Sequence, residues 1–174
     1  MIKNIALLLI LMGAPIFGQS NNDYIEEKKI VKSYYEYYNN WDFDKLLTLY
    51  HSSYFKNMKA VMIQSGAKLD DQIDFKEHFK NMLKQGMELR HKSQKEYIKN
   101  NTYKILNYEV KKIEDSEEIK DPLQIIVEVS GKSNGVSYKG KMVYILHKEK
   151  NEYKIADMGK YEVYQKLLKK QLAP

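Results

Sequence analysis

After the first twenty-odd residues, apolar positions recur at helical spacing. From Asp23 to Asn39 they share one face of a predicted helix, at Ile30, Val31, Tyr34, Tyr35, Tyr37 and Tyr38. The pair Asn39-Asn40 ends this pattern, and Asp42 is placed to cap a second helix. Spacing of i, i+3, i+4 and i+7 then predicts an amphipathic helix that contains Phe43, Leu46, Leu47 and Tyr50.

The next stretch is less regular. Residues 52–68 fit either a short strand or a helical piece. The helical pattern returns at Asp74, and Glu77 stands three residues later, which resembles a capping box with aspartate in place of serine. Gly86 is expected to close that helix, since glycine often follows the last helical turn.

The second half of the chain has the composition of β-strands. Residues 103–113, 123–133, 136–148 and 152–162 are rich in β-branched and aromatic side chains. Asn134-Gly135 separates two of these runs and predicts a tight hairpin turn. The sequence therefore predicts an antiparallel meander with residues 136–148 in a central strand.

That central strand is apolar on both faces. Met142, Tyr144 and Leu146 alternate with Val143 and Ile145. One face can pack on the helices, so the other needs a cover. Two covers are considered: a second copy of the chain, giving a homodimer through the outer sheet face, or the tail after residue 162, with Val163, Leu167 and Leu168 at helical spacing.

The first residues are expected to be a secretory signal peptide. Lys3 precedes an apolar run from Ile5 to Met12, which is shorter than the ~20 residues of a membrane span. Pro15 and Gly18 follow, and cleavage is predicted after Gly18, with Ala14 as an upstream alternative. We therefore expect a periplasmic or secreted protein with no stable membrane insertion after cleavage. An uncleaved anchor is the alternative.

Composition narrows the function classes. The chain of 174 residues suits one domain, divided here into signal peptide 1–18, domain 19–162 and a tail 163–174 that can be helical. There is no cysteine, so no disulfide or thiolate metal site is possible. The net charge of +6 rests almost wholly on lysine, with Arg90 the single arginine. Arginine is the usual reader of phosphates and bases, so we expect no nucleic-acid partner.

Candidate chemistry is sparse. The four histidines have no spacing typical of a metal site, and the glycines form no phosphate loop or dinucleotide fingerprint. No catalytic residue, metal site or cofactor is therefore predicted. Two ionisable residues are candidates. His78 lies on an apolar helical stripe and is either a core histidine or a base. Asp157 near the end of the last strand is either solvated or directed at a cavity mouth.

The stretch "VKSYYEYYNNWDFDKLLTLYHSSYF" resembles the start of NTF2-like domains. This superfamily includes ketosteroid isomerase, scytalone dehydratase and SnoaL-type cyclases. An aromatic first helix, a polar break, an aspartate and an "L..LY" helix carry the resemblance, which extends over most of residues 23–160. Residues 56–73 do not align. The resemblance implies a cone-shaped, cystatin-like α+β fold, with N-terminal helices packed on a curved antiparallel sheet.

In such a fold, the tyrosines of the first helix are either core or the lining of a ligand pocket. The predicted pocket residues are Tyr34, Tyr35, Tyr38, Trp41, Phe55, His78, Tyr144 and Asp157. We expect a non-catalytic, exported binding module for a small apolar ligand or a partner segment. The alternatives are an isomerase, dehydratase or cyclase that uses Tyr with Asp or His, and an interaction protein that uses only its outer sheet face.

Overall fold

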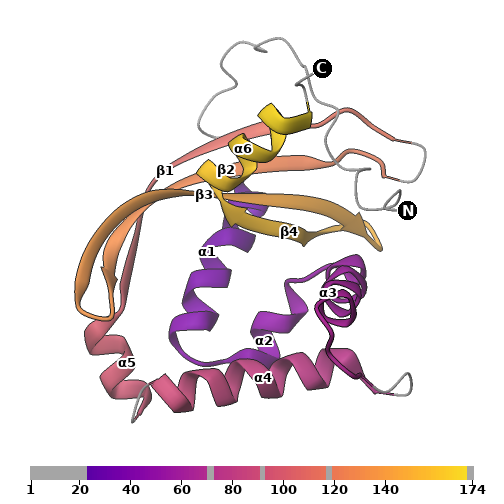
Figure 1. Cartoon of the computed structure of the whole chain (residues 1–174). Coiled ribbons are helices and arrows are strands. Elements are labelled where there is room, and N and C mark those ends of the chain that lie inside the picture. Colours follow the sequence, from indigo (N-terminus) through magenta and orange to yellow (C-terminus); the bar gives the residue numbers. More distant parts are fainter. Residues whose placement is uncertain (1–22, 70–72, 91–92, 117–118, 172–174) are drawn as a thin grey trace.

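The computed structural model describes residues 23–69, 73–90, 93–116 and 119–171, with side chains in the last helix as far as Lys166. The predicted signal peptide and its cleavage site lie outside the described residues. The described chain is α+β, with helices on a four-stranded antiparallel sheet (Figure 1). This confirms the predicted fold class at the level of secondary-structure content and strand direction.

The helices of the first half follow the predicted pattern closely. Helix α1 spans Ile25–Asn39 and α2 spans Phe43–Thr48. The side chain of Asp42 caps α2 by accepting a hydrogen bond from the Lys45 amide at 3.2 Å. Residues 52–68 are mainly helical, because α3 spans Ser52–Gln64.

The sequence predicted that the helix after Asp74 ends at Gly86, and this prediction is wrong. Helix α4 spans Phe75–Arg90. Met87, one residue further, is only 5 % exposed and accepts the Tyr38 hydroxyl at its sulfur. Burial of this side chain offsets the helix propensity that glycine lacks, about 1 kcal/mol. Helix α5, Gln94–Asn100, then leads into the sheet.

The strands form the predicted meander in the order β1-β2-β3-β4. Their bounds are Thr102–Lys112, Leu123–Ser133, Val136–Glu149 and Glu152–Lys160. Asn134 and Gly135 have φ values of 50° and 80°, the left-handed conformation of a tight hairpin turn. Lys150 and Asn151 repeat that geometry between β3 and β4, with φ values of 52° and 68°. Strand β3 has a neighbour on both sides, as predicted.

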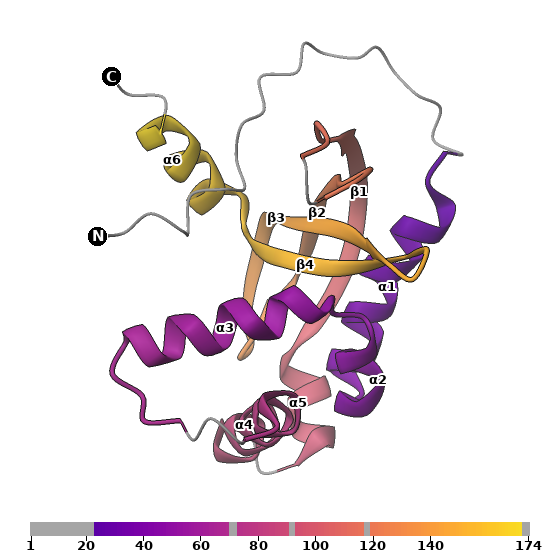
Figure 2. The same ribbon diagram turned by 90° about the vertical axis from the view of Figure 1, so that its right-hand side faces the viewer.

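The sheet is curved, and its two faces are covered differently (Figures 1 and 2). Helices α1–α5 lie on the concave side, which we call the inner face, and α6, Tyr161–Gln171, lies on the outer face. Inner-face residues such as Ile125, Tyr144 and Leu146 share one core cluster with the helices. Ile126, Val143 and Ile145 form a separate cluster on the outer face with Tyr164 of α6.

A glycine makes room for the docking of α6. A Cβ atom on Gly159 of β4 would lie 2.8 Å from Cε2 of Tyr164. The Tyr164 ring therefore occupies the space that a side chain at position 159 would take. This contact places the tail over the apolar outer face, one of the two covers considered from the sequence.

Within the part of the chain that the structure describes, no helix is both long enough and apolar enough to cross a membrane.

Candidate functional site

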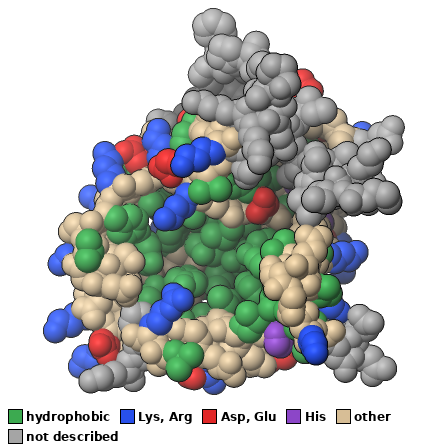
Figure 3. Space-filling view, viewed as in Figure 1, with side chains coloured by type: hydrophobic (Ala, Val, Ile, Leu, Met, Phe, Trp, Pro, Cys, Tyr) green, Lys and Arg blue, Asp and Glu red, His purple; other side chains and the backbone are tan. Residues whose placement is uncertain are grey.

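The concave side of the sheet carries a depression with a hydrophobic floor (Figure 3). We call this depression the inner hollow. Side chains from the inner face and from the helices beside it contribute partly exposed aromatic and sulfur-bearing surface. Those that we assign to the inner hollow are Tyr35, Tyr54, Phe55, Met58, Tyr103, Tyr138, Met142 and Met158.

Helix α1 brings its tyrosines against β3 at the base of the inner hollow. The Tyr34 ring stacks on Tyr38 with centroids 5.9 Å apart and meets Tyr144 edge-on at 5.6 Å. Tyr35 lies 5.3 Å from Tyr103, and Tyr103 lies 6.0 Å from Tyr138. These rings form one continuous layer that joins α1 to β1 and β3.

The same layer continues towards α3 and α4. Residues 49–51 pair with β4, because the Ile155 amide donates to the Leu49 carbonyl at 2.7 Å and the Ile155 carbonyl accepts from His51 at 2.9 Å. This short pairing fixes Tyr50, whose ring lies 4.3 Å from Tyr54. Phe55 contacts Tyr50 and, at 6.1 Å, Phe79 of α4.

Trp41 lies at the end of the layer that contacts α5. It has a φ of 56° in the tight connection between α1 and α2, and its ring lies 5.9 Å from Tyr97 of α5. Tyr97 also meets Tyr38 edge-on at 6.3 Å. Trp41 therefore packs the connection between α1 and α2 against α5.

Several phenol groups of this layer have a raised pKa. Burial raises the pKa of Tyr34, Tyr50 and Tyr144 well above the usual value, and neighbouring phenols add to the effect. Burial also raises the pKa of Tyr35 to about 12. None of these tyrosines is thus tuned to act as a base near neutral pH.

Two of the hydroxyls donate to sulfur. Tyr38 donates to Sδ of Met87 at 3.8 Å, and Tyr50 donates to Sδ of Met158 at 3.6 Å. Sulfur is a weak acceptor, and methionine is a flexible side chain that adapts to irregular surfaces. The layer therefore combines rigid rings with adaptable neighbours.

The two ionisable candidates come from different elements, α4 and β4. His78 on α4 is half-buried, with its ring 6.0 Å from Phe75. Asp157 is exposed on the edge strand β4, and it pairs in register with Ile145, whose side chain belongs to the outer face. Its carboxylate accepts from the Met158 amide at 2.7 Å and contributes to a raised pKa of Tyr54.

The sequence-based set missed several residues of the inner hollow. Tyr138 and Met142 share a face with the predicted Tyr144, because they are separated by even numbers of residues on one strand. That strand period would have found them. Tyr103 and Met158 come from other strands, and only the register places them beside this set.

Gly140 leaves space on the inner face between Tyr138 and Met142. It pairs with the buried Val129, and a Cβ atom at Gly140 would meet nothing within 4 Å. A side chain at this position would project into the inner hollow. The sequence thus supplies aromatic rings along the strand and leaves one position empty.

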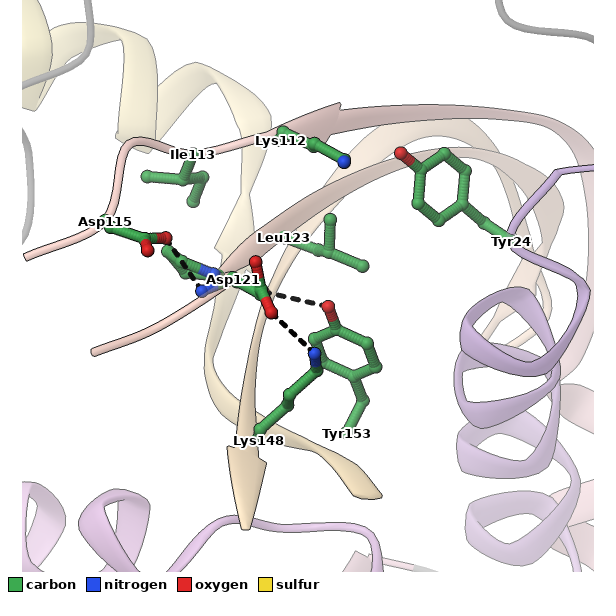
Figure 4. A pocket seen from close by; sticks show the side chains of 9 residues that line it. Tyr24, Lys112, Ile113, Asp115, Asp121, Leu123, Lys148 and Tyr153 are labelled. Carbon is green, nitrogen blue, oxygen red and sulfur yellow. Dashed lines mark hydrogen bonds and ion pairs between the residues drawn. The ribbon is translucent and has the colours of Figure 1, made fainter. Parts of the chain in front are cut away.

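Two half-open pockets lie elsewhere, and charged residues contribute to their linings. One, of about 250 Å³, is bordered by Tyr24, Lys112 and the turn at Asp121 (Figure 4). Asp121 has a φ of 48°, and its carboxylate pairs with Lys148 at 2.7 Å, which lowers the Asp121 pKa. Tyr153 donates to its carbonyl at 2.9 Å. These bonds hold a strained turn in place.

The second pocket, of about 270 Å³, lies beside His51 and His147. The two rings are 5.6 Å apart. His51 caps α3 by accepting from the Ser53 amide at 3.1 Å. Burial, and then the neighbouring His51, lower the pKa of His147 to about 4. Among the described residues, no group of three or more potential ligands is arranged to hold a metal ion.

Comparison with known proteins adds a fold-level similarity. No protein-family model and no curated protein matches this chain. Among solved structures, the chain is similar to the helical cell shape determining protein Pgp2 from Campylobacter jejuni, with a TM-score of 0.50 and 14% sequence identity. The match covers 75% of this chain and 38% of that chain, so this chain spans well under half of its neighbour's length. At this identity the similarity supports the α+β fold alone.

Proposed function

We propose that the chain is an exported domain of the NTF2-like class that binds a small, mostly apolar ligand, or an apolar partner segment, in the inner hollow. The inner hollow corresponds to the cone interior of that class. Support for the class comes from the sequence pattern of residues 31–55 and from the packing of α1 along the concave face of the curved sheet (Figure 1).

One observation carries the proposal of binding. A continuous layer of tyrosines, flanked by methionines, lies at the floor of an open apolar depression. A contiguous exposed apolar patch on a soluble domain commonly marks a binding surface. The phenol hydroxyls can orient a ligand through hydrogen bonds, while the rings and thioethers supply contact area.

The chemistry of the described side chains favours binding over catalysis. An isomerase, dehydratase or cyclase of the same fold would need an acid and a base directed at one substrate. The tyrosines are neutral, His78 lies beside Phe75, and Asp157 is exposed on the edge strand. The third interpretation, binding by the outer face alone, would need that face to be open, whereas α6 lies over it.

Filling the inner hollow tests the proposal. Gly140→Leu adds an apolar side chain on the inner face, where space is available. Lys141→Leu adds the same side chain one residue later, on the opposite face of β3. We expect the apolar fluorophore Nile red to bind the wild type and Lys141→Leu equally, and Gly140→Leu at least tenfold more weakly. Equal binding to all three proteins would refute a site in the inner hollow.

Export is part of the same proposal and needs its own test. Residues 1–18 carry the predicted signal peptide. Mass spectrometry of the periplasmic or culture fraction should find a mature chain that begins at Gln19. A full-length chain recovered only with membranes would contradict export with cleavage.

A further inference from the structure

We propose that the ligand of the inner hollow is an alkyl carboxylic acid, with its alkyl chain on the tyrosine and methionine floor and its carboxylate at Arg90. This inference rests on the proposed binding function and specifies its ligand. Three features support it: the flexibility of the floor, the position of Arg90, and a second cation, Lys160, on the inner face.

The composition of the floor favours a flexible chain over a rigid ring system. Five methionines belong to the core cluster on this side of the sheet or pack against it: Met58, Met62, Met87, Met142 and Met158. Unbranched thioether side chains adjust to ligands of varying shape. Each methylene buried against such a surface contributes about 0.8 kcal/mol. An alkyl chain is the simplest ligand that uses this surface.

Arg90 stands at the end of this floor. It lies in the last turn of α4, three residues after Met87, so both side chains are on the same side of the helix. The Tyr38 hydroxyl donates to Sδ of Met87 at 3.8 Å. The pKa of Tyr38 is raised, because burial has the largest effect, and the charge of Arg90 opposes this rise. The guanidinium is therefore close to the tyrosine layer.

The surroundings of Arg90 leave room for a ligand. Gly86 precedes it by one helical turn on the same side, and a Cβ atom there would meet nothing within 4 Å. Arg90 is exposed, and it is not a partner in any ion pair identified between described residues. A guanidinium binds a carboxylate through two parallel hydrogen bonds.

A second cation lies on the sheet side of the inner hollow. Lys160 pairs in register with Met142, so the two side chains point to the inner face, and Lys160 is exposed. Figure 3 shows basic side chains, and also an acidic one, at the margin of the depression. Asp157 adds to the effect of burial that raises the Tyr54 pKa, whereas Arg90 acts on Tyr38. The inner hollow thus favours a negative head group.

Three ligands with the same alkyl chain separate the contributions. Isothermal titration calorimetry would compare decanoate, decanol and decyltrimethylammonium on the mature chain. We expect decanoate to bind about tenfold more tightly than decanol, which corresponds to one partly exposed charge-assisted contact. This preference should shrink at high ionic strength, because salt screens exposed charges. Decyltrimethylammonium should bind most weakly.

Variants assign the preference to particular residues. Arg90→Met should remove most of the preference for decanoate over decanol and leave decanol binding unchanged. Lys160→Met should reduce the preference by about twofold. Lys132→Met makes the same change of charge at an exposed position of β2 away from the inner face, and it should have no effect. Denaturant unfolding of each variant checks that the fold is retained.

The outcomes distinguish this inference from the function on which it rests. If none of the three ligands binds the wild type, the proposed small-ligand function fails, and this inference fails with it. If decanol and decanoate bind equally, or if Arg90→Met keeps the preference, only the assignment of a carboxylic acid to Arg90 is overturned. If decyltrimethylammonium binds best, the inner hollow selects cations through its aromatic rings instead.

Discussion

The two faces of the sheet differ in their side chains and in how they are covered. The inner face adds tyrosine and methionine to aliphatic residues such as Ile125 and Leu146. Its Tyr34, Tyr35 and Tyr144 rings are in mutual contact beneath a partly open depression. The outer face uses the aliphatic residues Ile126, Val143 and Ile145, and one helix closes it. Successive side chains of β3 point alternately to the inner and the outer face.

This difference shows which face is built for packing alone. Aliphatic side chains offer no hydrogen bond to a ligand, and the Tyr164 ring fills the gap at Gly159 of the outer face. Tyrosines bring hydroxyl groups that stay useful at a surface, and Gly140 leaves space between them. The predictions below test this contrast, beginning with the largest expected effect.

The inner tyrosines should differ among themselves in their contribution to stability. Tyr144 is completely buried, so Tyr144→Ala should lower the free energy of unfolding by about 4 kcal/mol. Tyr35 is partly exposed, and Tyr35→Ala should cost about 2 kcal/mol. Lys32→Ala on the exposed side of α1 serves as the control, within about 0.5 kcal/mol of wild type. Urea unfolding measures all three, and equal losses for both tyrosines would contradict this division.

Removal of α6 should expose the outer face. A chain that ends at Lys160 loses the buried Tyr164 ring, and its free energy of unfolding should fall by about 3 kcal/mol. Light scattering should show self-association of the truncated chain, since Ile126, Val143 and Ile145 lose their cover. The full mature chain should not associate through this face. A truncated chain that stays monomeric and equally stable would show that α6 is not the cover.

The two glycines should respond in opposite ways to the same substitution. Gly159→Leu pushes a side chain into Tyr164, so it should cost about 2 to 3 kcal/mol of stability and loosen α6. Gly140→Leu projects into open space and should stay within about 1 kcal/mol of wild type. Limited proteolysis within residues 161–171 would report on α6, and cleavage of both variants at the wild-type rate would argue against the Tyr164 contact.

Acid should destabilise the fold through a histidine on the outer side of the sheet. His147 lies two residues after Ile145 on β3, so its side chain points to the same outer face. Burial, and then the neighbouring His51, lower the pKa of His147 from 6.5 to about 4. A lowered pKa in the folded state means that stability is full above pH 6.5 and is lost as the pH falls towards 4.

The loss between pH 7 and pH 5 should be about 2 kcal/mol, and His147→Gln should remove it. The inner tyrosines do not titrate in this range, because burial raises their pKa. Urea unfolding of wild type and His147→Gln at both pH values measures the difference. An identical pH dependence in the two proteins would show that His147 is not the responsible group.

The smallest effect concerns the hydroxyl groups of the inner face. Tyr38→Phe removes only the hydrogen bond to the Met87 sulfur, so the free energy of unfolding should change by about 0.5 kcal/mol or less. Binding of decanol should also be unchanged, because the ring stays in place. A loss above about 1.5 kcal/mol would show that the hydroxyl has a stronger partner than sulfur.

The sequence by itself determined most of the secondary structure. Helical spacing placed α1 and α2, with Asp42 as a cap, and strand composition with Asn134-Gly135 placed the central hairpin. These signals are short-range, because a turn residue or an amphipathic stripe depends only on neighbours in the chain. Part of the candidate site followed in the same way, since Tyr34, Tyr35 and Tyr38 share one helix face.

Only the tertiary structure decided which of these elements meet. The irregular pattern of residues 52–68 did not reveal a helix, and Gly86 did not end α4, because burial of Met87 outweighs a local preference. The contact of Tyr35 with Tyr103 joins residues from α1 and β1, and it depends on the curvature of the sheet. The docking of Tyr164 at Gly159 likewise depends on the position of α6 at the end of β4. No local pattern in the chain encodes this position.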